Sequence, residues 1–92
     1  MNKPTRPEDT LIEYPSAFPI KVMGANVDGF AQAMAEVALI HDPSFDAATI
    51  EMRASSGGNY IGLTITVTAT SREQLDNLYR ALTSHPLVKY VL

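Results

Sequence analysis

The sequence has no cysteine and no tryptophan. Without cysteine the chain can form neither a disulfide nor a thiolate metal site. No apolar stretch approaches the roughly 18 to 20 residues that a membrane-spanning helix needs. The first ten residues are charged, contain Pro4 and Pro7, and lack the apolar segment of a signal peptide. We therefore expect a cytoplasmic protein without a membrane segment.

Basic side chains are also few, because seven Lys and Arg stand against ten Asp and Glu and the net charge is -3. Phosphate contacts need a basic surface, so a nucleic-acid partner is not expected. The 92 residues are enough for one domain. We expect residues 1–10, which are polar and proline-containing, to form a flexible tail, and residues 11–92 to form the domain.

Catalytic and metal-binding patterns are missing from the sequence. Only His41 and His85 could act as bases near neutral pH, and both are expected near helix ends. No H-x-x-x-H spacing or G-x-S-x-G motif occurs. We expect no enzyme activity, no metal site and no cofactor.

The first half of the domain predicts a strand followed by a helix. Phe18, Ile20 and Val22 occupy alternate positions, which indicates a strand with one packed face that ends at Gly24. Asn26 is expected to cap the helix, and Asp42 is expected to remain in solvent at its end. The expected apolar stripe of this helix consists of Val27, Phe30, Met34, Val37, Ala38 and His41.

A hairpin is predicted next. Residues 49–54 alternate with Ile50, Met52 and Ala54 inward, and the Ser-Ser-Gly-Gly-Asn cluster at 55–59 predicts a turn. The second hairpin strand, residues 60–69, alternates over its whole length. Its inward residues are expected to be Ile61, Leu63, Ile65, Val67 and Ala69.

The last part of the chain predicts a second helix and a short strand. Thr70 and Glu73 have the spacing of a capping box. The apolar stripe that follows consists of Leu75, Leu78, Tyr79 and Leu82. In the terminal strand, the inward residues are either Val88, Tyr90 and Leu92, which we favour, or Lys89 and Val91.

The resulting element order is βαββαβ, which is the plan of an α+β, ferredoxin-like fold. Right-handed crossovers predict an antiparallel sheet of order 4-1-3-2 with both helices on one face. The other face is therefore open. It is expected to present Lys21, Met23, Glu51, Arg53, Tyr60, Thr64, Thr66 and Thr68.

Several segments resemble one family of proteins. They are residues 11–15 (Leu-Ile-Glu-Tyr-Pro), 21–24 (Lys-Val-Met-Gly), 55–60 (Ser-Ser-Gly-Gly-Asn-Tyr), 78–79 (Leu-Tyr) and 91–92 (Val-Leu). From about residue 11 to residue 92, the chain resembles the YbeD-like family of small uncharacterised bacterial proteins. The resemblance implies a fold like that of ACT regulatory domains and a lipoate-binding regulatory role. The family often has lysine where this chain has Gly57, and the resemblance implies no catalytic residues.

Two sets of residues are candidate binding sites. Free backbone amides and the helix dipole could bind a carboxylate between the first strand and helix. ACT-like domains often bind amino acids at this loop, although Gly24 and Asn26 could simply form a turn and a cap. The loop residues are Gly24, Ala25, Asn26, Val27 and Asp28. The sheet-face and turn residues are Lys21, Met23, Arg53, Asn59, Tyr60, Thr64 and Thr66.

The sheet-face set has three interpretations. It could form a dimer interface, which we favour, or it could bind a ligand or RNA; a single exposed aromatic such as Tyr60 is poorly suited to RNA. We expect a non-enzymatic, homo-oligomeric regulatory module that senses a small carboxylate, either lipoate or an amino acid, and contacts an unidentified protein. The alternatives are an RNA-binding module and an adaptor without a ligand.

Overall fold

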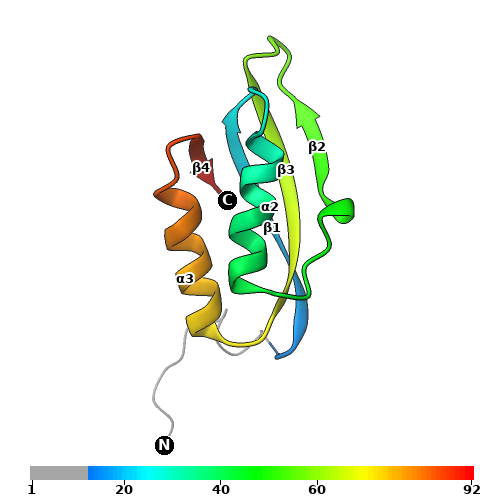
Figure 1. The fold of residues 1–92 in the computed structure, drawn as a ribbon, viewed down its shortest axis with the longest axis vertical. Helices are drawn as coiled ribbons and strands as arrows, with labels where there is room; N and C mark the ends of the chain where they lie inside the picture. Colours follow the sequence, from blue (N-terminus) through cyan, green and yellow to red (C-terminus); the bar gives the residue numbers. More distant parts are fainter. Residues whose placement is uncertain (1–12) are drawn as a thin grey trace, which may run out of the picture.

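The computed structural model describes residues 13–92. The elements follow in the order β1 (Ser16–Ala25), α2 (Phe30–His41), η1 (Ala47–Thr49), β2 (Glu51–Ala54), β3 (Tyr60–Ala69), α3 (Arg72–Thr83) and β4 (Val88–Val91), of which η1 is a single 3-10 turn (Figure 1). The predicted tail at residues 1–10, like Leu11 and Ile12, lies outside the described residues.

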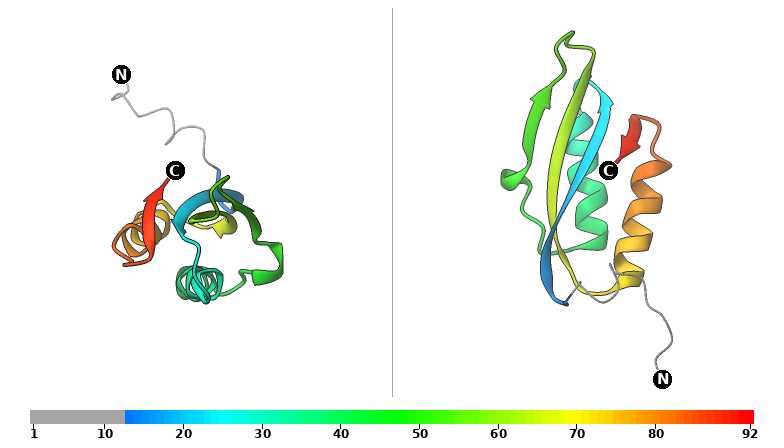
Figure 2. Two further views of the ribbon diagram at one scale, coloured as in Figure 1. Left: turned by 90° about the horizontal axis from the view of Figure 1, so that it is seen from above. Right: turned by 180° about the vertical axis from the view of Figure 1, so that it is seen from behind.

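The strands form one antiparallel sheet in the order β2-β3-β1-β4. This is the predicted order read from the opposite edge, and the α+β, ferredoxin-like fold is confirmed. The centre of the sheet is the long pair of β1 and β3, which runs from Ser16 opposite Ala69 to Ala25 opposite Tyr60. Both helices lie on one face, and the described residues leave the other face open (Figure 2).

The core lies between the sheet and the helices. The predicted alternation is confirmed in β1 and β3: the inward side chains from Ile20 to Val22 and from Leu63 to Ala69 are buried, whereas Phe18 and Ile61 are half-buried. In α3 the predicted Leu75, Leu78 and Leu82 are buried. The core residues are Ile20, Val22, Phe30, Met34, Ala35, Ala38, Phe45, Leu63, Ile65, Val67, Ala69, Leu75, Leu78 and Leu82.

Ile50, Met52 and Ala54 were expected to pack inward, and this expectation was wrong for Met52 and Ala54. All four residues of β2 are exposed, and Met52 retains 62% of its side-chain exposure. Met52 lies opposite the buried Leu63, so it points to the helix side. β2 is an edge strand, and the helices do not extend far enough to cover Met52 and Ala54, whereas Ile50 before the strand is half-buried.

The junction between β1 and α2 also differs from the prediction. β1 continues through Gly24 to Ala25, and α2 begins at Phe30 after Gly29, whose φ of 87° is left-handed. Asn26 does not cap the helix, because its side-chain Nδ2 donates to the carbonyl of Gly58 instead, at 2.9 Å. Val27 precedes the helix and is exposed.

Gly24 is needed for close packing rather than for a turn. A Cβ atom at this position would lie 2.4 Å from the Phe30 ring and 2.5 Å from the carbonyl oxygen of Leu87. Real Cβ atoms essentially never approach other atoms so closely. The absence of a side chain at Gly24 therefore lets the first turn of α2 and the segment before β4 meet over β1.

β4 follows neither of the two predicted alternations. Tyr90 pairs with Met23 but Val88 pairs with Gly24, so a bulge interrupts the register. The extra residue lets Val88 and Val91 both pack against the core. Tyr90 consequently points to the open face, which the favoured prediction had excluded.

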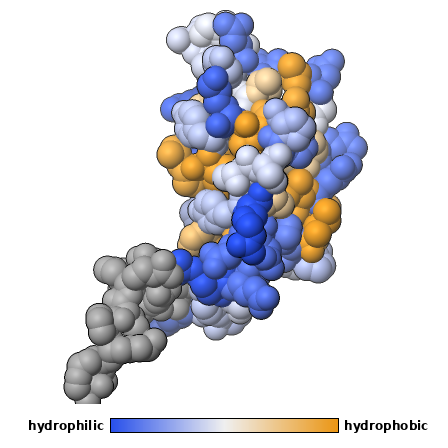
Figure 3. Space-filling view, turned by 90° about the vertical axis from the view of Figure 1, so that its left-hand side faces the viewer, coloured by the Kyte–Doolittle hydropathy of each residue, from blue (hydrophilic) through white to orange (hydrophobic). Residues whose placement is uncertain are grey.

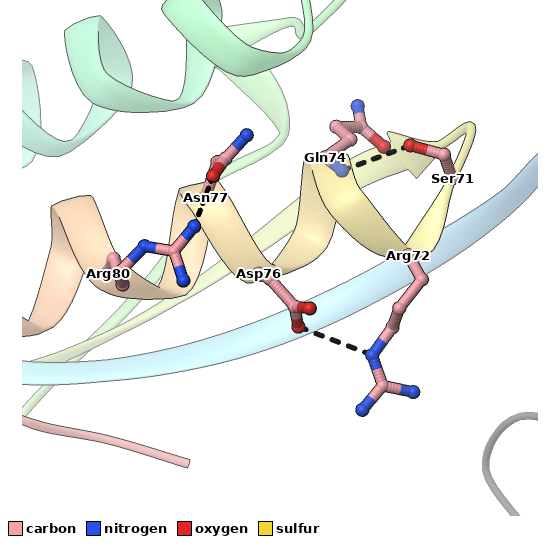
Figure 4. A network of polar contacts seen from close by, with 6 residues as sticks. All are labelled: Ser71, Arg72, Gln74, Asp76, Asn77 and Arg80. Carbon is pink, nitrogen blue, oxygen red and sulfur yellow. Dashed lines mark hydrogen bonds and ion pairs between the residues drawn. The ribbon is translucent and has the colours of Figure 1, made fainter.

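α3 begins one residue later than the predicted capping box. The hydroxyl of Ser71, not that of Thr70, accepts a hydrogen bond from the backbone N–H of Gln74 at 3.0 Å (Figure 4). The Gln74 side chain in turn accepts from the N–H of Thr70 at 2.6 Å. Figure 4 also shows the contacts on the exposed side of α3, an Arg72–Asp76 ion pair of 3.2 Å and an Arg80–Asn77 hydrogen bond.

Asp42 was expected in solvent but is buried, with 4% of its surface exposed. Its carboxylate accepts hydrogen bonds from the Ser44 hydroxyl at 2.6 Å, the Ser44 N–H at 3.0 Å and the Thr68 N–H at 2.8 Å. Burial by itself raises the pKa of Asp42, but the three hydrogen bonds together lower it by more than burial raises it. The pKa therefore lies below the ordinary 3.8. The carboxylate thus joins the end of α2 to β3.

Candidate functional site

Two rows of side chains cross the open face of the sheet. In the first row, Arg53 on β2, Gly62 on β3, Met23 on β1 and Tyr90 on β4 lie side by side. This register follows from the pairing of β3 with its two neighbours and from the bulge in β4. The row combines one cation, one aromatic and one thioether around a position without a side chain.

The second row lies two residues further along β3, at Thr64. Glu51 pairs with Thr64, and Thr64 pairs with Lys21. Leu92 continues the row beyond Lys21, to whose carbonyl its N–H donates at 2.8 Å. This row therefore brings an anion and a cation to opposite sides of a half-buried threonine.

Between the two rows is a hollow of about 500 Å³, which we call the open-face hollow. A Cβ atom at Gly62 would make ordinary contacts with Met23 Cε at 3.5 Å and the Arg53 carbonyl at 3.7 Å. Gly62 therefore leaves room that any other residue would occupy. The hollow is lined by Lys21, Val22, Met23, Glu51, Met52, Arg53, Ala54, Ser55, Gly62, Leu63, Thr64, Tyr90 and Leu92.

The chemistry of this lining is mixed. Lys21 and Arg53 can pair with an anion, and Arg53 can do so with two parallel hydrogen bonds. Apolar surface comes from Met23 and from Tyr90, whose side chain is 47% exposed. Glu51 supplies one negative charge at the β2 side. The hollow can accordingly hold a small molecule that has an acidic group and an apolar portion.

Tyr60 lies on the same face, two residues before Gly62 on β3. The Nζ atom of Lys89 stands 5.1 Å from the centre of the Tyr60 ring, which is a cation–π distance. Tyr60 is 41% exposed. Together with Tyr90, the open face therefore presents two aromatic rings and, with Lys21, Arg53 and Lys89, three cations.

The predicted loop at residues 24–28 uses much of its polar backbone internally. The N–H groups of Ala25, Asn26 and Val27 donate to Leu87, Asn59 and Ala25 respectively, at 3.2, 3.1 and 2.9 Å. Asp28 adds an exposed negative charge next to the start of α2. These contacts weaken the case for an anion site in the loop, although ligand binding there stays a prediction.

The structure brings the loop and the hairpin turn together. The N–H of Asn26 donates to the carbonyl of Asn59, and its side chain donates to Gly58. Asn59 thus supports the loop with its backbone. Of the other predicted residues, Lys21, Met23, Arg53 and Thr64 line the open-face hollow, whereas Tyr60 and Thr66 lie beyond it on β3.

Among the residues of the hollow that sequence reasoning missed are Gly62, Tyr90 and Leu92. The predicted alternation, with Ile61 and Leu63 inward, places Gly62 on the outer face of its strand, and a lone glycine in a strand often marks a close approach. Tyr90 and Leu92 were placed inward because strict alternation takes no account of the bulge. The local sequence carries no clear signal for that bulge.

The two histidines have structural contacts. The Nδ1 atom of His85 accepts a hydrogen bond from the N–H of Leu87 at 3.1 Å, and the carbonyl of His41 accepts from the Gln74 side chain at 2.9 Å. Within residues 13–92, no three side chains of His, Cys, Asp or Glu gather in a way that could hold a metal ion.

The side of the molecule with α3 and β4 carries apolar surface in its upper and middle part, next to hydrophilic side chains (Figure 3). Exposed apolar residues of the described chain include Ile40 and Leu92, which are 74% and 71% exposed. No helix in the described part of the chain has both the length and the apolar character required to cross a membrane.

Comparison with known proteins places the chain among bacterial relatives. Residues 9–92 match the model of a family described as "Protein of unknown function (DUF493)". A UPF0250 protein of Leptothrix cholodnii is 66% identical over 85 residues, which cover 92% of this chain and 93% of the relative. A UPF0250 protein of Bordetella pertussis is 66% identical, and the match covers 94% of this chain and 94% of the relative. A UPF0250 protein of Paraburkholderia phytofirmans is 56% identical, and the match covers 91% of this chain and 94% of the relative. The resemblance found in the sequence is confirmed.

Proposed function

The chain belongs to the DUF493 family of proteins of unknown function, and from that premise we propose that it is a non-enzymatic, cytoplasmic regulatory module. It binds a small carboxylate with an apolar portion, such as lipoate or an amino acid, in the open-face hollow. It then acts through contacts with a second protein and with copies of itself. The observation that carries this proposal is the hollow over Gly62 between Lys21 and Arg53.

The charge distribution of the hollow supports an acidic ligand. The whole chain is negatively charged, yet two of the three charged side chains in the hollow are positive. Arg53 and Lys21 stand on opposite sides of Gly62 and Thr64, on β2 and β1. A carboxylate above β3 would lie between both cations, and each charge-assisted hydrogen bond contributes about 1.5 to 3 kcal/mol.

The apolar surface of the hollow supports a ligand with a hydrocarbon or amino-acid side chain. Met23 on β1 and Tyr90 on β4 lie opposite each other, and Leu92 lies in the next row. Methionine adapts its shape to different apolar partners. Each buried CH₂ group of a ligand would contribute about 0.8 kcal/mol here.

Isothermal titration calorimetry on the full chain tests this proposal. The probes are lipoate, a panel of amino acids, and lipoamide, which keeps the apolar part of lipoate but lacks its charge. We expect binding of at least one carboxylate, no comparable binding of lipoamide, and affinity reduced about ten- to a hundredfold by Arg53→Ala. The matched control is Arg80→Ala on α3, which removes an arginine from the helix side.

If none of the carboxylates binds at millimolar concentration, the sensor part of the proposal is wrong for those ligands. Binding that Arg53→Ala leaves unchanged would move the site elsewhere. In that case the loop at residues 24–28 becomes the location to test, with Asn26→Ala as the variant. An adaptor without a ligand is the function that remains if no site responds.

A second candidate function is binding of single-stranded RNA. It is favoured by one observation, the outward orientation of Tyr90, which places a second aromatic ring on the face that carries Tyr60. Bases stack on such rings, and Lys89 and Arg53 could pair with phosphates. The net charge of -3 and Glu51 oppose this interpretation.

Fluorescence anisotropy with labelled oligouridine distinguishes the two candidates. An RNA-binding face predicts affinity that falls steeply with salt and that drops about ten- to a hundredfold on Tyr90→Ala. A carboxylate-binding module predicts no measurable RNA affinity at physiological salt. Tyr79→Phe, which changes a tyrosine on α3, is the control.

A further inference from the structure

β2 is a free edge of the sheet. Among the described residues it pairs only with β3, and all four of its residues, Glu51–Ala54, are exposed. We infer that β2 pairs antiparallel with β2 of a second copy of the chain, with Met52 opposite Met52 of that copy. This inference rests on the part of the proposed function that concerns self-association and is independent of any ligand.

The hydrogen-bonding pattern of the hairpin fixes which groups of β2 are available. The N–H of Ser55 donates to the carbonyl of Tyr60 at 2.9 Å, so these two residues form a hydrogen-bonded pair. Bonded pairs alternate along an antiparallel ladder, so Arg53 and Glu51 also bond to β3. The N–H and C=O groups of Met52 and Ala54 therefore point to the free edge.

These groups match those of a second copy in the register that we infer. Met52 and Met52 of the second copy would exchange two N–H···O=C bonds. The N–H of Ala54 would donate to the carbonyl of Ile50 in the second copy, and the reverse bond follows by symmetry. The N–H of Ile50 already donates to Ala47, at 3.2 Å, and is not required.

The charges on β2 specify this register. With Met52 opposite Met52, Glu51 faces Arg53 of the second copy and Arg53 faces its Glu51, so two ion pairs form on the open face. Both are non-hydrogen-bonded positions, at which opposing side chains lie closest in an antiparallel pair. Opposite charges at such positions stabilise a sheet, whereas like charges destabilise it.

The neighbouring registers are disfavoured by the same residues. If the second strand slides by two residues in one direction, Glu51 lies opposite Glu51 of the second copy. If it slides by two residues in the other direction, Arg53 lies opposite Arg53. If the strand slides by a single residue, Met52, whose backbone groups point to the free edge, lies opposite Glu51 or Arg53, whose backbone groups already bond to β3. The sequence Glu-Met-Arg on an edge strand thus selects one symmetric pairing.

The pairing would also change the site. It joins two sheets into one and brings the two open-face hollows next to each other, because Glu51 and Arg53 line the hollow at the β2 edge. Arg53 of the second copy would neutralise Glu51, which is the negative charge in the lining. By the same symmetry, Glu51 of the second copy would pair with Arg53, so the net charge of each hollow stays the same and Lys21 is the charged side chain of the lining that lies outside these ion pairs.

The solution mass of the full chain, measured by sedimentation over a concentration series, tests the inference. We expect a dimer of twice 10.0 kDa whose dissociation constant rises with salt. Glu51→Arg should raise that constant at least about a hundredfold, because like charges then face each other. Arg53→Glu should do the same, and the combined variant Glu51→Arg with Arg53→Glu should restore the dimer.

Three further variants separate this pairing from other contacts. Met52→Pro removes an N–H that does not bond to β3, so it should dissociate the dimer while circular dichroism confirms the fold. Glu36→Arg, an equal charge reversal on the exposed side of α2, should leave the dimer intact. Thr66→Glu, which charges the open face away from β2, should also leave it intact.

The inference is overturned if the chain is a monomer at about 1 mM, or if Glu51→Arg and Met52→Pro leave a dimer unchanged. A dimer that only Thr66→Glu dissociates would be assembled through the open face instead. That result would retain self-association and reject the β2 pairing. Calorimetry on the monomeric Met52→Pro variant tests the ligand part separately, because this variant keeps Lys21, Glu51 and Arg53 and carboxylate binding does not require the dimer.

Discussion

The carboxylate of Asp42 accepts a hydrogen bond of 2.8 Å from the backbone N–H of Thr68, 26 residues further along the chain. The same carboxylate bonds twice to Ser44, so each of its donors is a neutral group. Gln74 strengthens this junction, because its side-chain amide donates to the carbonyls of His41 and Thr68 at 2.9 and 3.0 Å. Two polar side chains, Asp42 and Gln74, therefore join the end of α2, the end of β3 and the start of α3, in addition to the apolar packing between them.

Asp42→Asn should destabilise the protein by about 1 to 3 kcal/mol at pH 7, because an amide offers one acceptor atom where the carboxylate offers two. Since the folded-state pKa of Asp42 is depressed, its contribution is present above the ordinary value of 3.8 and is lost as the pH falls through the folded value. The difference in unfolding free energy between wild type and variant should thus shrink below about pH 4. Urea denaturation at several pH values measures it.

Asp76→Asn is the matched control for Asp42→Asn. Asp76 is exposed and pairs with Arg72 on the surface of α3, so its loss should cost less than about 1 kcal/mol. A difference for Asp42→Asn that stayed constant from pH 7 to well below 4 would contradict the assignment of a depressed pKa.

The elements and their order were predictable because the signals for them are local. Alternation in β1 and β3 and the three-to-four spacing in the helices report which side of each element is buried. Right-handed crossovers then leave few arrangements for βαββαβ. β2 shows the limit of this reasoning, because the alternation of Met52 and Ala54 was correct while their burial depended on how far the helices reach.

What sequence reasoning missed depends on contacts between distant residues. Asn26 bonds to Gly58, 32 positions away, which removed the predicted helix cap. Asp42 is buried because Thr68 supplies a donor, and nothing near Asp42 indicates this. In the candidate site, Lys21, Met23, Arg53 and Thr64 were placed correctly on one face, whereas the bulge in β4 concealed Tyr90 and Leu92.

Gly24→Ala should destabilise the protein by about 1 to 3 kcal/mol, because its methyl group would overlap the Phe30 ring and the Leu87 carbonyl. The ring could turn away, but the carbonyl belongs to the backbone before β4 and cannot move freely. Gly62→Ala is the control, since its Cβ would have ordinary contacts at 3.5 Å and beyond. The urea midpoint should fall for Gly24→Ala and stay equal or rise for Gly62→Ala. Equal losses would show that the close approach at Gly24 is unimportant.

Ser71→Ala should destabilise the protein by about 1 kcal/mol, because its hydroxyl caps α3 by accepting from the N–H of Gln74. Thr70→Ala should have a much smaller effect, since the Thr70 contact to Gln74 uses the backbone N–H, which alanine retains. Thermal unfolding of the two single variants compares them directly. A larger loss for Thr70→Ala would instead support the capping box predicted from the sequence.

Gly62→Val should weaken carboxylate binding at least about tenfold without lowering stability. Valine is favoured in strands, and its side chain would project into the open-face hollow where glycine leaves space. Because Met23 Cε is 3.5 Å from the position of a Cβ, the larger side chain would also displace the thioether from the apolar side of the hollow. Calorimetry with the carboxylate that binds wild type, together with a urea titration, measures both effects. Gly57→Val in the hairpin turn is the matched control, since it adds the same side chain at a position that does not line the hollow. If Gly62→Val binds the carboxylate as tightly as wild type does, the ligand does not occupy this hollow.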